Sequence, residues 1–157
     1  MKNRLKGVTL IETMLYIGLF SIIMVIILNF MLSTQEATNR NNEKTNLNRT
    51  SVFLSQHISD SFSKTISINQ DTSVFDSDQG VLTLNFSSEG KQYTFIDSRI
   101  YFNNIPITPT SLSITQFKLE PVFKDLTALI GVKITISAYS EKVPELSETI
   151  NILEIIR

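Results

Sequence analysis

The sequence predicts an α+β fold in which one long N-terminal helix packs on an antiparallel β-sheet domain. Residues 13–32 form an uncharged apolar run, and apolar residues on one helical face follow between residues 47 and 62. Neither proline nor glycine occurs between residues 21 and 65. The rest of the chain alternates apolar and polar residues in short segments with turn-sized connections, which is typical of strands. A helix followed only by antiparallel strands is an α+β arrangement.

The first seven residues are basic and end in glycine. Lys2, Arg4 and Lys6 precede Gly7, and they are three of the fourteen lysines and arginines in the chain. Cations before an apolar span favour a cytoplasmic N-terminus. We therefore expect residues 1–7 to form a cytoplasmic leader and the domain beyond the span to be exported.

Residues 13–32 form an apolar run long enough to cross a bilayer. None of these twenty residues is charged, and at about 1.5 Å per residue such a helix covers about 30 Å, the thickness of a hydrocarbon core. We expect a transmembrane helix over residues 8–32. A cleaved secretory signal is the alternative, although its apolar part is usually shorter and residues 35–37, Gln-Glu-Ala, form a poor cleavage site.

A single carboxylate, Glu12, stands at the start of this apolar run. A charge at depth in a membrane costs about 2.5 kcal/mol or more, so such a residue usually has a partner. One local explanation is a capping box, because Thr9 and Glu12 have the spacing at which two side chains satisfy free N–H groups of a helix start. That explanation accounts neither for Gly7 nor for the short basic leader.

Residues 7–12, with the sequence Gly-Val-Thr-Leu-Ile-Glu, and the apolar helix after them resemble the processing site of type IV prepilins and the related pseudopilins. The resemblance implies that a prepilin peptidase cuts after Gly7 on the cytoplasmic side and methylates the new amine of Val8. It also implies that Glu12 of an incoming subunit pairs with the Val8 amine of a neighbour. Two groups that are each costly in lipid would then neutralise each other and set the register between subunits.

The resemblance favours a minor pilin or pseudopilin. Major pilins commonly have a proline within the apolar segment, whereas the first proline of this chain is Pro106. The layout is similar to J-type pseudopilins and W-type minor pilins. The implied filament is a type IV pilus, a competence pilus or a type II secretion filament, and the motif is common to all three.

The partners implied by the resemblance are other pilin or pseudopilin subunits, the prepilin peptidase, the membrane and the assembly platform. The implied location is a single-pass membrane protein, with the N-terminus in the cytoplasm, that later joins a cell-surface or periplasmic filament. We expect no direct nucleic-acid binding, because the formal net charge is −1 and lysines and arginines do not cluster in the exported domain.

Residues 33–66 are expected to continue the helix as an amphipathic segment. Apolar residues fall on one helical stripe at spacings of seven, four and four: Leu47, Leu54, Ile58 and Phe62. We expect one nearly continuous helix from about Thr9 to about Lys64. Its middle part, residues 34–46, is dense in asparagine, threonine and charge and is expected to be a solvated neck.

Residues 67–157 are expected to form the exported antiparallel β domain, without disulfides since the chain has no cysteine. Alternation predicts strands at residues 81–86, 93–96, 99–102, 111–120, 132–139 and 149–156. Ser88-Glu89-Gly90-Lys91 and Asp97-Ser98 are expected to be turns.

The sequence predicts no enzyme and no cofactor. His57 is the only histidine, and its place beside the apolar stripe favours a residue at the helix boundary over a catalytic one. No phosphate-binding glycine loop, catalytic triad or His-x-x-His spacing is visible.

A weak calcium candidate precedes the strand at residue 81. Asp71, Asp76 and Asp78 could supply oxygen ligands, but their spacing is not that of an EF-hand loop. An aspartate-rich turn is the simpler interpretation.

Two other classes of protein remain open. A membrane-anchored extracytoplasmic binding domain that does not polymerise would keep Met1 and have no use for Glu12. A secreted binding domain would begin near residues 34–38.

Overall fold

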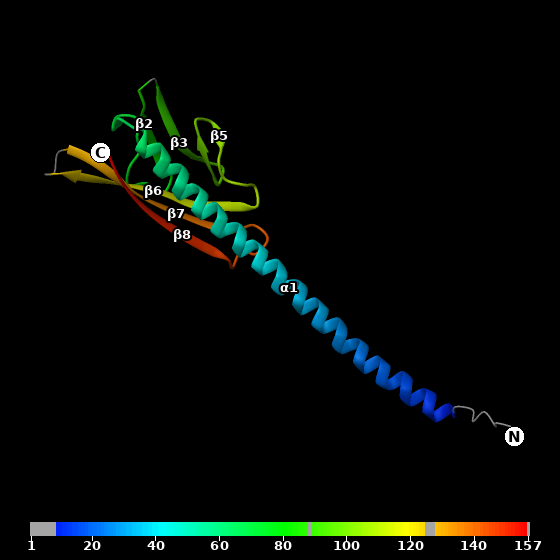
Figure 1. Cartoon of the computed structure of the whole chain (residues 1–157). Helices are drawn as coiled ribbons and strands as arrows, with labels where there is room; N and C mark the ends of the chain where they lie inside the picture. Colours follow the sequence, from blue (N-terminus) through cyan, green and yellow to red (C-terminus); the bar gives the residue numbers. More distant parts are fainter. Residues whose placement is uncertain (1–8, 88, 125–127, 157) are drawn as a thin grey trace. The chain divides into compact units, whose positions relative to one another are not determined.

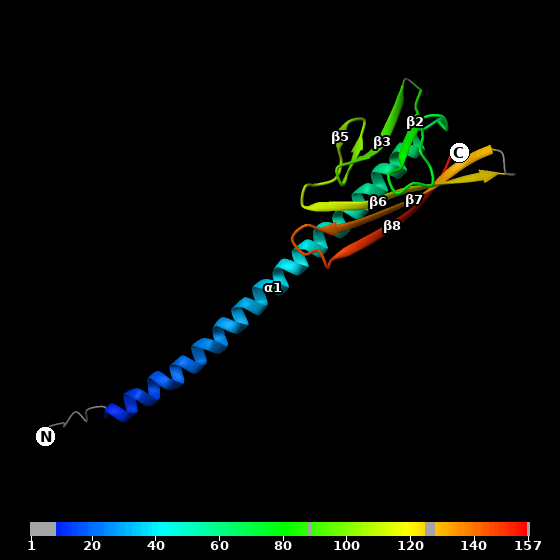
Figure 2. The same cartoon turned by 180° about the vertical axis from the view of Figure 1, so that it is seen from behind.

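The computed structural model describes residues 9–87, 89–124 and 128–156 of the chain. It contains one helix, α1 (Leu10–Ser63), and then only antiparallel strand pairs, so the α+β prediction is confirmed. The chain divides into two compact units, Met1–Asn41 and Asn42–Arg157. The C-terminal part of α1 belongs to the second unit together with all strands (Figures 1 and 2).

Helix α1 matches the expected length to within about one residue at each end. Thr9 lies immediately before it, and the Thr9 carbonyl accepts bonds from the N–H groups of Glu12 and Thr13, at 3.1 and 3.2 Å. At the other end the N–H groups of Lys64 and Thr65 turn back to the carbonyls three residues earlier. These tighter bonds satisfy carbonyls that the helix leaves free and end it before the first strand.

The first sheet is a five-stranded meander with the order β1-β2-β3-β4-β5. Its strands are β1 (Ser67–Ile68), β2 (Val81–Asn85), β3 (Gly90–Ile96), β4 (Arg99–Phe102) and β5 (Ile105–Pro106). The two-residue turns at residues 97–98 and 103–104 have positive φ at every position, between 48° and 67°. Asp and Asn adopt this left-handed conformation more readily than most residues, and primed turns of this kind match the twist of a hairpin.

The second sheet is a three-stranded meander with the order β6-β7-β8. Its strands are β6 (Leu112–Lys124), β7 (Ala128–Ser140) and β8 (Ser147–Ile155). Both β6 and β7 extend beyond the expected ends, past Pro121 and Gly131, because Pro121 pairs with Val132 within the ladder. Gly131 suits its place in β7, since a Cβ atom there would overlap the carbonyl oxygen of Glu154.

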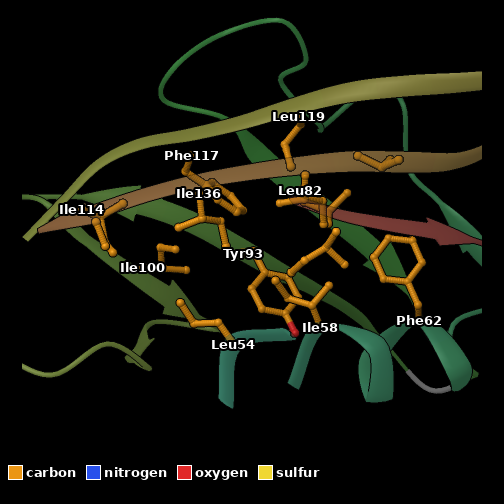
Figure 3. Packing of buried hydrophobic residues seen from close by; sticks show 14 of the residues in the cluster. Leu54, Ile58, Phe62, Leu82, Tyr93, Ile100, Ile114, Phe117, Leu119 and Ile136 are labelled. Carbon is orange, nitrogen blue, oxygen red and sulfur yellow. The ribbon is translucent and has the colours of Figure 1, made fainter. Parts of the chain in front are cut away.

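The core lies between the C-terminal part of α1 and the two sheets. The four residues of the predicted helical stripe are at most 4% exposed, which confirms that prediction. Figure 3 shows Leu54, Ile58 and Phe62 directed from the helix toward side chains of the strands. The strand residues that meet them include Leu82, Tyr93, Ile100, Ile114, Phe117, Leu119 and Ile136.

The expectation that residues 34–46 are solvated is wrong at Glu43. Residues 34–42 are exposed, but the Glu43 side chain is only 4% exposed. Its carboxylate accepts a hydrogen bond of 2.9 Å from Ser140 and lies 3.3 Å from the ammonium of Lys142. Lys44 and Thr45 after it are exposed again, so Glu43 is the one buried residue of the expected neck, and it lies just inside the second unit.

Candidate functional site

The first half of α1 presents an exposed apolar surface. Helix α1 is long and apolar enough to cross a membrane, and its most apolar window of eighteen residues has none of its residues buried. Most of the exposed large apolar side chains of the described chain lie between Leu10 and Leu32. A surface of this kind is stable in lipid or against other apolar helices rather than in water.

Glu12 lies in the first turn of α1, at the N-terminal edge of this surface. Its backbone N–H donates to the Thr9 hydroxyl at 3.4 Å, which is one half of the capping box that the spacing allows. In the part of the chain that the structure describes, the Glu12 carboxylate makes no return bond to the Thr9 N–H. The side chain of Glu12 is therefore not needed to cap this helix.

The Glu12 carboxylate is directed along the helix instead. The Tyr16 hydroxyl, one turn further on, donates a long hydrogen bond of 3.5 Å to Glu12 Oε1. No lysine or arginine pairs with Glu12 within residues 9–87, 89–124 and 128–156. A carboxylate oxygen of Glu12 is therefore available to accept a hydrogen bond from a group that does not belong to these residues.

The two residues expected to flank the processing site, Gly7 and Val8, lie outside the described residues. Of the predicted processing and assembly residues, only Glu12 has a described position. The start of α1 at Leu10 places it two residues inside the helix.

The three calcium candidates are exposed. Asp71 donates its backbone N–H to the Asn69 side chain, and Asp78 Oδ1 accepts a bond of 2.7 Å from Gln116. Asp76 has a positive φ of 56° and donates its N–H to the carbonyl of Leu119. Among the described residues no three His, Cys, Asp or Glu side chains gather as a metal site.

His57 is half-buried at the boundary between α1 and the first sheet. Its Nδ1 lies 2.8 Å from the hydroxyl of Tyr93, which also lies 2.7 Å from the Ser61 hydroxyl. The rings of Phe53 and Phe102 pack against the imidazole, with centroids 5.6 and 4.9 Å away. Burial lowers the pKa of His57, and burial raises the pKa of Tyr93 to about 12. This arrangement resembles a structural anchor between α1 and the first sheet.

A small ion network lies on the outer face of the second sheet. Glu120 accepts bonds from the ammonium groups of Lys118 and Lys133, at 2.9 and 2.7 Å. The hydrogen bond from Lys133 is the main reason that the pKa of Glu120 falls to about 2. The pair with Lys118 raises the pKa of that lysine. The network is solvent-exposed, so it contributes little to stability.

Sequence reasoning missed Tyr16 and Glu43. Tyr16 follows Glu12 by four residues, a spacing at which side chains on a helix meet, so their contact could have been predicted from the sequence. The burial of Glu43 could not have been predicted in this way, because its partner Ser140 is 97 residues away along the chain.

Comparison with protein-family models, with curated proteins and with solved structures found no match to this chain.

Proposed function

We propose that this chain is a minor pilin or pseudopilin subunit that is processed after Gly7 and polymerises through its N-terminal helix. The observation that carries the proposal is that the Glu12 carboxylate has no cation beside it in the described chain. A carboxylate at the edge of an exposed apolar helix is costly in lipid, yet within the described chain no cation neutralises it. An amine from a neighbouring subunit would remove that cost.

The proposed pairing uses the new N-terminus that cleavage creates. Removal of residues 1–7 leaves an α-amine on Val8, four residues before Glu12. In its protonated form this amine on one subunit donates to the Glu12 carboxylate of the next, so each pair of subunits is fixed at one axial register.

The domain beyond the span supports the same proposal in a general way. It is built from an amphipathic helical segment packed on antiparallel sheets, the layout that the prepilin resemblance implies. In the proposed topology this domain is exported, and the filament serves a type IV pilus, a competence pilus or a type II secretion system. The partners are other subunits, the prepilin peptidase, the membrane and the assembly platform.

The test replaces Glu12 in the full chain and measures both membrane insertion and recovery in sheared filaments. Glu12→Ala should insert normally, while its incorporation into filaments falls by about tenfold or more, since each contact leaves an amine unpaired. Glu36→Ala is the matched control, because Glu36 is also an exposed glutamate of α1. Equal incorporation of both variants would favour an anchored domain that does not polymerise.

A further inference from the structure

The two sheets have four edges, and three of them are protected against added strands. Edges β1 and β5 are each two residues long, and β5 ends in Pro106. The outer edge of β6 is covered at residues 117–119 by residues 76–80, with bonds of 2.8 Å from Asp76 to Leu119, from Gly80 to Phe117 and from Phe117 to Asp78, and Pro121 lies further along the strand. Short strands, proline and covering segments are the usual means by which proteins blunt a sheet edge.

The fourth edge, β8, has none of these protections. It is nine residues long, it contains neither proline nor lysine, and its pairing with β7 runs without a register shift. Leu153 and Ile155 are 60% and 50% exposed. No backbone hydrogen bond reaches the outer side of β8 from the residues that the structure describes. A long, regular and exposed edge is a template for another strand.

The hydrogen bonds to β7 show which backbone groups of β8 are free. The Ile156 N–H donates to the carbonyl of Ile130 at 2.8 Å, in register with the ladder. Since bonded pairs alternate along an antiparallel strand, the even-numbered residues of β8 bond to β7. The odd-numbered residues direct their N–H and C=O groups outward: Ser147, Thr149, Asn151, Leu153 and Ile155.

Two separate hollows lie between α1 and β8. Leu47 and Asn48 line the first together with Lys44 and residues 145–148, and Ser59, Phe62, Ser63 and Thr65 line the second together with residues 154–155. Figures 1 and 2 show β8 beside the C-terminal part of α1.

The charged residues that line the two hollows favour a basic strand. Glu148 lines the first hollow with Glu145 and one cation, Lys44, and Glu154 lines the second. Glu148 and Glu154 are half-buried, and neither forms an ion pair within the described chain. They are six residues apart on the same face, a separation of about 20 Å in a strand. Two copies of β8 paired about Asn151 would place Glu148 opposite Glu154, which disfavours self-pairing in that register.

We propose that the edge of β8 binds an extended segment of a partner protein, which adds as a fourth strand and carries lysine or arginine at two positions six residues apart. The main chain of that segment bonds the five outward residues of β8. Its two basic side chains reach Glu148 and Glu154. This interaction requires neither processing at Gly7 nor pairing at Glu12.

The experiment measures binding of a labelled synthetic nonapeptide to the full chain in detergent micelles by fluorescence anisotropy. The peptide alternates valine and threonine and has lysine at its second and eighth positions, and a control peptide has glutamate there. We expect the lysine peptide to bind about tenfold more tightly at low salt, because it forms two partly exposed charge pairs. Equal affinity for both peptides, or no binding of the lysine peptide, overturns the proposal.

Two variants test whether the strand edge itself is used. Leu153→Pro removes an outward N–H and keeps every bond to β7, whereas Leu153→Ala removes the same exposed side chain and keeps the N–H. We expect Leu153→Pro to weaken peptide binding about tenfold or more and Leu153→Ala to leave it nearly unchanged, with similar melting temperatures. Equal binding by both variants overturns the proposal. So does a wild-type dimer that Leu153→Pro abolishes, because the occupant is then a second copy.

Discussion

Glu43 of α1 accepts a hydrogen bond from Ser140 at the end of β7, and both side chains are buried. The Ser140 hydroxyl in turn accepts the N–H of Val143, so the bond also orders the turn between β7 and β8. Lys142 of that turn lies on the other carboxylate oxygen. This contact ties the start of the second unit to the connection between its last two strands.

Glu43→Ala should therefore destabilise the β domain by about 1–3 kcal/mol, because the buried Ser140 hydroxyl loses its acceptor. Thermal unfolding of the full chain in detergent, followed by circular dichroism, measures the change. Lys142→Ala is the matched control, since this side chain is 73% exposed, and its cost should stay below about 1 kcal/mol. An equal loss in both variants would show that the ion pair matters more than the buried hydrogen bond.

Gly131→Ala should lower the stability of the second sheet. A Cβ atom at Gly131 overlaps backbone atoms of β8, which cannot move aside without breaking the β7–β8 ladder. We expect a loss of about 1–3 kcal/mol, as for other overpacked positions. Gly90→Ala is the control in β3, because its Cβ would meet neighbours only at 3.6 Å or more and should be tolerated. A stable Gly131→Ala variant would mean that β8 is more loosely paired than the structure shows.

The His57 contact makes stability depend on pH. Burial lowers the pKa of His57 below its ordinary value of 6.5, with a smaller opposing effect of Asp60. The unfolded chain therefore binds the proton more tightly, so stability is greatest above about pH 6.5 and falls as the pH drops through the two pKa values. Melting temperatures between pH 8 and pH 5 should decrease for the wild type and change less for His57→Gln. An identical pH dependence in both proteins would exclude His57 as the cause.

Calcium should not stabilise the β domain. Asp71, Asp76 and Asp78 are not gathered as a metal site, and Asp78 is already bonded to Gln116. Melting temperatures of the full chain in millimolar calcium and in chelator should agree. A rise with calcium that Asp76→Asn abolishes would contradict this account.

The long helix was predictable because its signals are local. The absence of breakers and the stripe that ends at Phe62 depend only on neighbouring residues, and the structure places the helix end at Ser63. The strand β2 and the turn at residues 97–98 were predictable for the same reason. Glu12 has the cap contact that its spacing suggested, but only in one direction.

The predictions that failed concern residues whose burial or place in a strand depends on partners far away in the sequence. Pro121 and Gly131 suggest strand ends, yet pairing across β6–β7 and β7–β8 overrides that tendency. The short strand β5 contains Pro106, and because proline is disfavoured in strands, residue preferences do not predict it. The burial of Glu43 depends on Ser140, and no spacing within α1 predicts it.

The central claim is that cleavage after Gly7 creates the amine that Glu12 binds. The most direct test is the intact mass and N-terminal peptide of the protein taken from its native membrane, with a strain lacking the prepilin peptidase as control. The account predicts a methylated N-terminus at Val8, and an uncleaved chain only in the control strain. An intact Met1 in the presence of active peptidase would contradict it and leave an anchored domain that does not polymerise.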